Sequence, residues 1–224
     1  VGTATMAVVL ALVPPQGGAA DPVAERAHPS FQALLTKQMI ILGVGVLSAA
    51  AGPISINVLV GVTARDNLGL TGREAGLLLL AGSVMAMLTG PLWGRLLDRV
   101  GARTAGLTAA TGVTVIAGLL AFADSPTNLA VLSAASGALI GFVTVVFQAL
   151  ASTIVPDNPG GALSFILAFR FFGHGLGPVI WIPVLDQNVP LAFLGAASLG
   201  TITIATFFAV VESGSNKPKS RPDH

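Results

Sequence analysis

Long runs of apolar residues separated by short polar connections dominate this sequence. A helix needs about 20 mostly apolar residues to cross a bilayer, and six stretches of the chain reach that length. The pattern therefore predicts an all-α membrane protein with six transmembrane helices. We expect these helices at residues 38–63, 72–93, 103–123, 126–155, 160–185 and 190–211.

The connections carry residues that start and stop helices. Thr71 and Glu74 stand three residues apart and predict a capping box at the start of the second helix. Ser125 followed by Pro126 predicts an N-cap and a first helical position for the fourth helix. Proline and glycine at residues 155–161 break the chain before the fifth helix.

Two segments flank the predicted helices. The apolar run at residues 1–13 is too short to cross a bilayer, and no basic residues precede it as in a signal peptide. We interpret it as the tail of a truncated preceding transmembrane helix. Residues 14–37 are expected to form a cytoplasmic linker, residues 38–212 a six-helix transmembrane bundle, and residues 213–224 a cytoplasmic tail.

The composition fits a surface that faces lipid. Hydrophobic residues make up 53% of the chain and charged residues 9%, whereas a soluble domain carries about 25% charged residues. The net charge of +1 gives no general attraction to nucleic acid. The chain has no cysteine, which excludes disulfides and thiolate metal ligands.

Basic residues in the connections predict the orientation, because cytoplasmic loops carry an excess of lysine and arginine. One side of the membrane would hold only Arg65 and Arg73, while Arg170 lies inside a predicted helix. We therefore expect an integral protein of the cell membrane with its linker and C-terminus in the cytoplasm. The cytoplasmic side would hold Arg26, Lys37, Arg95, Arg99, Arg103, Lys217, Lys219 and Arg221.

Small residues recur every fourth position in three of the predicted helices. This spacing places them on one face, where they let two helices approach closely in lipid. We interpret them as packing seams with only an indirect share in function. They are Gly82, Ala86 and Gly90, then Gly137 and Gly141, and then Gly173 and Gly177.

The connection between the second and third predicted helices reads GRLLDRVGAR, residues 94–103. It resembles the signature loop of the major facilitator superfamily of transporters, although Ala102 stands where the family usually has a basic residue. A merely basic cytoplasmic loop is the alternative interpretation, and the six predicted helices around it favour the family. The matching positions are Gly94, Asp98, Arg99, Gly101 and Arg103.

The resemblance implies an architecture and a role for this loop. Members of the family have two six-helix halves joined by a cytoplasmic linker, so this chain would be the C-terminal half of a twelve-helix fold. Its partner would be the missing N-terminal six-helix half. Because loops of this type lock the inward-closed state in the family, the five matching residues would form a conformational-switch loop.

Two basic side chains lie within the fifth predicted helix. Arg170 is roughly 15 Å from the cytoplasmic end of that helix at 1.5 Å per residue, and His174 follows one turn later on the same face. A charge at this depth is tolerated only against protein or water. We predict that both residues line a substrate or coupling cavity. The alternative is that Arg170 binds backbone carbonyls and His174 only packs.

Two further features accompany this pair. Gln148 in the fourth helix could reach the same depth and join the cavity, or it could form a hydrogen bond between helices. We expect the latter for Asn57 in the first helix. Gly177 and Pro178 predict a helix bend, and this stretch resembles the glycine-proline signature of the family's drug/proton antiporters.

The sequence has no nucleotide-binding GxxxxGK[ST] loop, no HExxH motif and no Cys/His cluster. We therefore predict neither an enzyme nor a cofactor or metal site. The resemblance implies a secondary active transporter that moves small solutes by alternating access, by proton-coupled efflux of drugs or metabolites. Its partners would be the bilayer, the solute and protons. Uptake of a small organic anion is one alternative, and a non-transporting fragment or half-transporter is the other.

Overall fold

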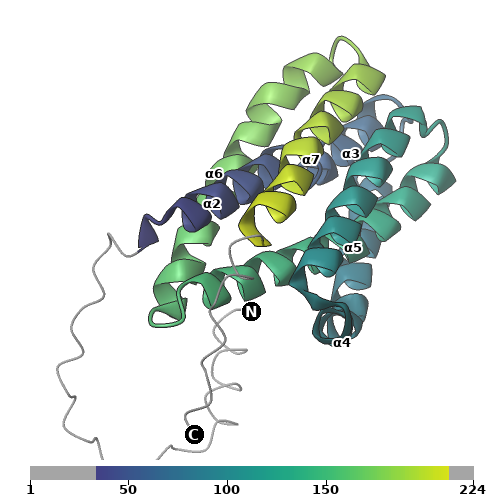
Figure 1. The fold of residues 1–224 in the computed structure, drawn as a ribbon. Coiled ribbons are helices and arrows are strands. Elements are labelled where there is room, and N and C mark those ends of the chain that lie inside the picture. The colour runs from purple at the N-terminus through teal and green to yellow at the C-terminus, as the bar shows by residue number, and fades with distance from the viewer. Residues whose placement is uncertain (1–33, 212–224) are drawn as a thin grey trace, which may run out of the picture. The chain divides into compact units, whose positions relative to one another are not determined.

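The computed structural model describes residues 34–211, and regular structure in this part of the chain is entirely helical (Figure 1). The all-α prediction is confirmed, and five helical stretches are long and apolar enough to cross a membrane. The predicted segment 1–13, most of the linker and the tail 213–224 lie outside the described residues. The elements are α2 (Lys37–Ala51), α3 (Ile56–Asp66), α4 (Gly72–Leu119), η2 (Leu120–Phe122), α5 (Pro126–Ile154), α6 (Pro159–Leu185) and α7 (Val189–Val211).

The predicted caps start their helices. The Thr71 backbone N–H donates to Glu74 Oε2 at 2.8 Å, and the Glu74 N–H donates to Thr71 Oγ1 at 3.3 Å, which completes the capping box of α4. Ser125 Oγ accepts from the Asn128 N–H at 3.2 Å at the start of α5. Each cap satisfies a backbone donor that the first turn of a helix leaves without a partner.

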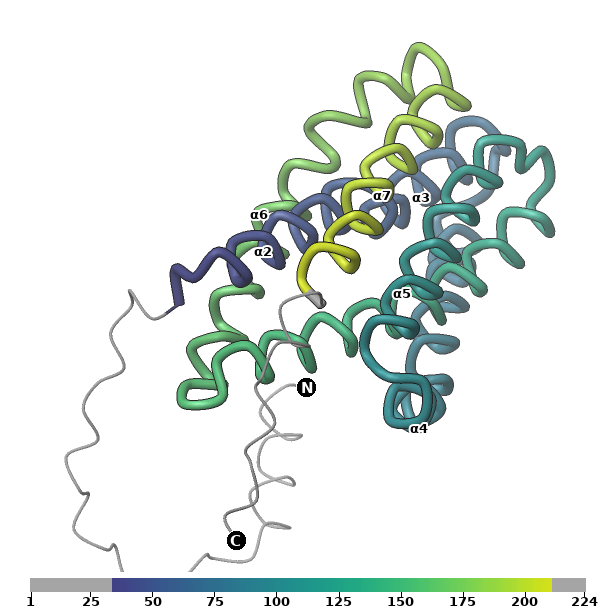
Figure 2. The backbone as a smooth tube through the Cα atoms, in the orientation of Figure 1, coloured from purple at the N-terminus to yellow at the C-terminus, as the bar shows by residue number. Residues whose placement is uncertain are grey.

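The second and third predicted helices form one 48-residue element, α4, and most of the expected connection at residues 94–103 is helical. Only Gly101 departs from helical geometry, with φ 77° and ψ 159°, a conformation essentially restricted to glycine. Gly82 and Gly112 nevertheless pack against neighbouring residues of α5, Gly137 and Leu139. Thirty residues of straight helix would separate them by about 45 Å, so the chain reverses between them, where Gly101 departs from helical geometry. The tube in Figure 2 shows the chain turning back beside the label α4.

The first predicted helix is broken, which corrects the expectation of a continuous helix at residues 38–63. Residues 52–55 form turns between α2 and α3. Pro53 has no N–H to donate, and the next donor, Ile54 N–H, reaches back five residues to the Ala49 carbonyl at 2.9 Å. The break therefore follows from a Gly-Pro pair inside an apolar run.

The predicted packing seams are confirmed where helices meet. A Cβ on Gly137 would collide with the backbone of Gly82, and the space beside Gly141 is filled by Ala86 at 3.6 Å. Gly173 and Gly177 face the end of α2 and the turn that follows it. Gly90 is the exception, because no described heavy atom lies within 4 Å of its Cβ position.

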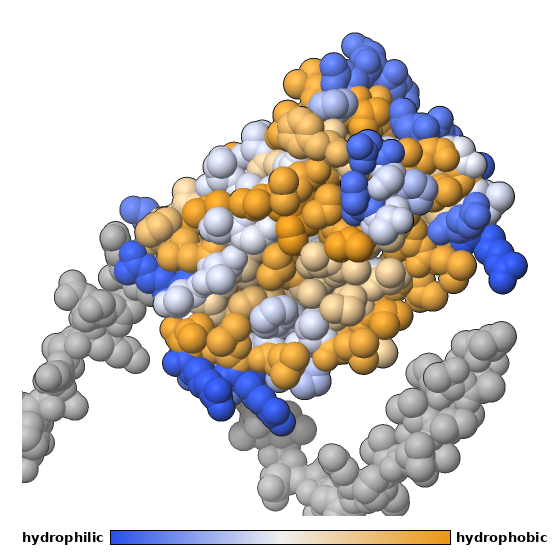
Figure 3. Space-filling view, turned by 90° about the vertical axis from the view of Figure 1, so that its right-hand side faces the viewer, coloured by the Kyte–Doolittle hydropathy of each residue, from blue (hydrophilic) through white to orange (hydrophobic). Residues whose placement is uncertain are grey.

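The surface and the interior are arranged as a membrane requires. On the face that Figure 3 shows, strongly hydrophilic residues form a few separate groups, mostly near the margins, and hydrophobic residues cover much of the surface between them. The α2–α3 segment is central, with 78% of its most apolar stretch buried, whereas the same share is 17% for α6. The outer side of α6 therefore presents Phe171, Phe172 and Val179 to its surroundings.

Candidate functional site

A small pocket, of about 20 Å³, lies where α2, α5 and α6 meet beside the break between α2 and α3. Its walls are mostly apolar, and three residues contribute polar side chains. The break matters because it brings a residue of the turn, Ile54, into the wall. The lining residues are Val46, Ile54, Thr144, Phe147, Gln148, Ile166, Leu167 and Arg170.

The structure brings Arg170 and Gln148 together in this pocket, one from α6 and one from α5. Both side chains are half-buried, and of the described residues that line the pocket Arg170 alone carries a charge. Thr144 donates its hydroxyl proton to the Ile140 carbonyl at 2.9 Å. Its oxygen is left as an acceptor. A guanidinium and an amide on an apolar wall can hold a planar polar group such as a carboxylate.

His174 lies beside the pocket without lining it. Arg170 Nε is 3.5 Å from His174 Nε2 and is oriented to donate to it. In this arrangement the ring nitrogen acts as an acceptor, which requires the neutral form of the imidazole. Protonation at Nε2 would replace that acceptor with a donor that faces the guanidinium. A positive charge on His174 would therefore break this hydrogen bond and repel Arg170.

Gly177 and Pro178 lie within an uninterrupted α6. The missing N–H of Pro178 leaves the carbonyl of His174 without its helical donor, and the predicted bend stays a prediction. Gly177 instead has a packing role, because a Cβ there would collide with Ser55 Oγ in the turn after α2. One turn further along α6, Trp181 Nε1 donates to the Ala51 carbonyl at 2.7 Å.

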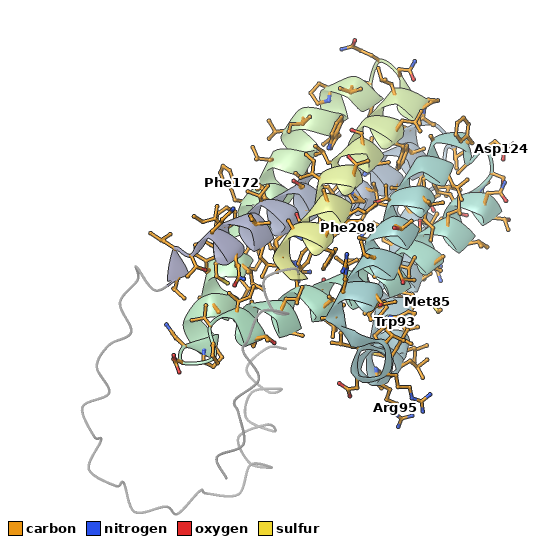
Figure 4. All side chains as sticks on the ribbon, in the orientation of Figure 1. Met85, Trp93, Arg95, Asp124, Phe172 and Phe208 are labelled. Carbon is orange, nitrogen blue, oxygen red and sulfur yellow. The ribbon has the colours of Figure 1, made fainter. Side chains whose placement is uncertain are left out.

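The residues of the predicted conformational-switch loop lie apart from the pocket, because none of them lines it. Gly94, Asp98 and Arg99 belong to the last turns of α4 before its reversal, and the two charged side chains are exposed. Gly101 makes the reversal. Arg103 follows it, and its guanidinium carbon lies 5.5 Å from the ring centre of Phe208 on α7, which is labelled in Figure 4.

A groove of about 550 Å³ lies between α3 and the start of α4. Asn57 lines it and is exposed, so the expected hydrogen bond between helices is absent among the described contacts of this residue. Arg65 and Asp66 put both charge signs on its wall. The groove therefore differs from the pocket around Arg170, whose described wall carries a single positive charge.

Apolar wall residues of the pocket could not be singled out from the sequence. Val46, Ile166 and Leu167 look like any other residues of a membrane helix, and only the three-dimensional packing selects them. The Gly-Pro pair at residues 52 and 53 was the one available signal, because it marks where a helix ends and exposes its backbone to neighbours. The hydrogen bond between Trp181 and Ala51 joins residues far apart in the sequence, so no local sequence pattern predicted it.

Comparison with known proteins gives a family and several relatives. A profile of the family described as Major Facilitator Superfamily matches residues 39–224. Proteins named multidrug resistance protein MdtG are similar to the chain in Rahnella sp. (strain Y9602), with 30% identity over 155 residues, and in Proteus mirabilis (strain HI4320), with 30% over 156. These matches cover 66% and 68% of this chain but only 37% and 38% of the relatives. The MdtG protein of Dickeya zeae (strain Ech586) is 28% identical over 154 residues, again 66% of this chain and 38% of the relative.

Proposed function

This chain belongs to the Major Facilitator Superfamily, and on that premise we propose that it is part of a secondary active transporter that moves small solutes across the membrane by alternating access. Proteins of this family are integral membrane transporters and generally not enzymes. The observation that carries the proposal is the meeting of Arg170 and Gln148 in a pocket between three apolar helices. A charge in the middle of a membrane helix is functional by default, because its insertion is costly.

We propose that the chain supplies the C-terminal six-helix half of a twelve-helix fold. The reversal at Gly101 supports six crossings, since it divides α4 into two parts that both pack against α5. The chain spans less than two fifths of the MdtG relatives that it matches. A complete transporter therefore requires an N-terminal half, and the activity belongs to that assembly.

Proton-coupled efflux of drugs or metabolites is the activity we propose for the assembly. The names of the relatives, multidrug resistance proteins, support efflux. The mostly apolar wall of the pocket supports a substrate of apolar character, since it offers few hydrogen-bonding groups. For coupling, His174 is the group in this half that can change charge in contact with Arg170.

The conformational switch is proposed for residues 94–103. Asp98 is exposed at the end of the first part of α4, where it is available to a partner outside the described residues. Gly101 fixes the direction of the reversal, and Arg103 is held over Phe208 of α7. A contact between Asp98 and the opposite half would close the cytoplasmic side and break during each transport cycle.

Uptake of a small organic anion is the second candidate. It is favoured by the charge of the pocket, because Arg170 faces no carboxylate among the described lining residues. A cationic solute would be repelled by this group unless an acidic residue of the other half balances it.

The third candidate is a non-transporting fragment, or a half that works only with a separate partner. It rests on the length of the chain compared with the length of its relatives.

Proton movement in proteoliposomes tests the proposal. The full-length protein and this 224-residue chain are reconstituted separately with a pH-sensitive dye inside the vesicles. Addition of a lipophilic cation or of an organic anion should move protons only with the full-length protein, and the effective solute separates the first two candidates. Transport by the chain alone would mean that it pairs with a second copy. If neither the cation nor the anion makes the full-length protein move protons, coupled transport of both solute classes is contradicted.

A further inference from the structure

A groove of about 340 Å³ runs along the last turns of the first part of α4, away from the pocket around Arg170. We call it the α4 groove. The positions of its residues recur every three or four residues, so they share one face of the helix. It is lined by Leu92, Trp93, Arg95, Leu96 and Arg99.

The α4 groove lies at the level where the hydrocarbon core of a bilayer meets the headgroups. Leu92 is 21 residues from the N-cap Thr71, a helical length of about 32 Å. This matches the roughly 30 Å thickness of the hydrocarbon core. Arg95 and Arg99 lie about 4 and 10 Å further along the axis. Trp93 is at the boundary, where tryptophan is enriched in membrane proteins.

The α4 groove is apolar at one end and cationic at the other. Leu92 is 57% exposed, so an acyl chain can reach it. Arg95 and Arg99 are exposed as well, and Figure 4 shows the side chain of Arg95 directed away from the helices at the lower end of α4. Two guanidinium groups one turn apart can share the oxygens of one phosphate.

The other charged groups of this stretch leave the two arginines available. Asp98 is exposed and does not line the α4 groove. Arg103 follows the reversal at Gly101 and lies over the ring of Phe208. Trp93 is held in place from the opposite side, because its Nε1 donates to the Ala138 carbonyl at 2.8 Å and its ring stacks on Phe142 at 4.5 Å.

We propose that the α4 groove binds an anionic phospholipid, with the phosphodiester between Arg95 and Arg99 and an acyl chain along Leu92. The site shares Arg99 with the proposed conformational switch, but lipid binding there requires only that the chain lies in a membrane, so it is tested without any measurement of transport. The proposed orientation supports this occupant, since anionic headgroups of the cytoplasmic leaflet attract basic residues close to the membrane. A zwitterionic lipid offers the same phosphate but no net charge.

Quenching of tryptophan fluorescence by brominated lipids tests the site, because Trp93 lines the groove. The chain is reconstituted in vesicles that contain phosphatidylcholine and either dibrominated phosphatidylglycerol or dibrominated phosphatidylcholine. We expect phosphatidylglycerol to quench Trp93 more strongly at equal mole fraction. The Trp93→Phe variant gives the background signal of Trp181, and the preference should disappear in it.

The arginines are tested against a matched pair, Arg65 and Arg73, which lie near the opposite end of the first part of α4. Arg95→Gln should reduce the preference for phosphatidylglycerol about fivefold, and adding Arg99→Gln should reduce it by a similar factor again. Arg65→Gln and Arg73→Gln, both exposed as well, should leave it unchanged. All four side chains are exposed, so the helices stay intact, which circular dichroism checks. Arg95→Lys keeps the charge and should retain most of the preference.

Three results would overturn the proposal. Equal quenching by the two brominated lipids would show that the α4 groove has no preference for an anion. A preference that survives the Arg95→Gln/Arg99→Gln substitutions would place the lipid elsewhere. Displacement of the brominated phosphatidylglycerol by inorganic phosphate at constant ionic strength would identify a site for free anions rather than for a lipid.

Discussion

Trp181 and Ala51 are joined by a hydrogen bond of 2.7 Å from the indole Nε1 to the backbone carbonyl oxygen, across α6 and the end of α2. The helical donor for this carbonyl would be Ser55 N–H, which bonds to the Gly52 carbonyl instead. Trp181 thus satisfies a carbonyl that the break between α2 and α3 leaves open. In a membrane such a group is costly without a partner.

Trp181→Phe should destabilise the protein by about 1–3 kcal/mol, the cost of leaving a buried acceptor without a partner. Trp93→Phe is the matched control. Trp93 Nε1 also donates to a carbonyl, that of Ala138 at 2.8 Å, but Ala138 lies inside the continuous helix α5 and keeps its helical partner. Unfolding in detergent measures both variants, and an equal loss of stability would contradict this role of Trp181.

Arg170→Ala should abolish transport by the full-length protein while leaving membrane insertion intact, because the pocket loses its charged group. Expression, membrane fraction and solute flux are measured together. Arg73→Ala serves as the control, since this exposed arginine lies in the first turn of α4. Normal flux in a well-expressed Arg170→Ala variant would rule out the proposed role of Arg170 in the pocket.

His174→Gln should separate solute movement from proton coupling. Glutamine can still accept a hydrogen bond from Arg170 Nε, now 3.5 Å from the imidazole, but it cannot take up a proton. We expect exchange of labelled solute across vesicles to continue while accumulation driven by a pH gradient falls. If both rates stay at the wild-type level, the coupling group lies in the other half.

Gly101→Ala should cost about 1–3 kcal/mol and impair transport, because its φ of 77° and ψ of 159° strain any residue with a side chain. Gly94→Ala offers a control within the same ten residues. Gly94 is helical, and no described heavy atom lies within 4 Å of its Cβ position. The alanine there should be neutral or stabilising by up to about 1 kcal/mol. Thermal unfolding of both variants checks the difference.

Gly137→Ala should loosen the contact between α5 and the first part of α4. Its new methyl group would meet the backbone of Gly82, which cannot move aside as a side chain would. Overpacking of this kind costs about 1–3 kcal/mol. Gly90→Ala adds a methyl group where no described atom stands within 4 Å and should be tolerated. Comparable unfolding temperatures for the two variants would contradict the close packing of this seam.

The extents of α5, α6 and α7 were predictable from hydropathy, and the caps at Thr71 and Ser125 were predictable from local sequence. Hydropathy scores side chains and carries no information on backbone conformation, however. It therefore did not predict the break at residues 52–55. It also placed a connection of ten residues where the chain uses one glycine to reverse. Because glycine has greater backbone freedom than other residues, Gly101 alone reverses the chain where other residues would need a longer loop.

The depth of Arg170 and Gln148 was predictable by counting residues along their helices, and the structure brings both into one pocket. His174 was expected beside them, yet its contact runs to Arg170 rather than to the pocket. The direction of a side chain depends on how its helix is rotated against its neighbours. Spacing along one helix leaves that rotation undetermined, so the wall formed by Val46 and Ile54 could not be anticipated.

The reversal of α4 at a single residue sets the phase between its two parts. Because each residue turns a helix by about 100°, one inserted residue beside Gly101 would rotate the whole second part about its axis. Gly106 and Gly112, which now face Phe207 and Leu139, would then point elsewhere. Substitutions in this region are far easier to accommodate than changes of length. An alignment of relatives should accordingly show no gaps around Gly101, even where the neighbouring residues differ.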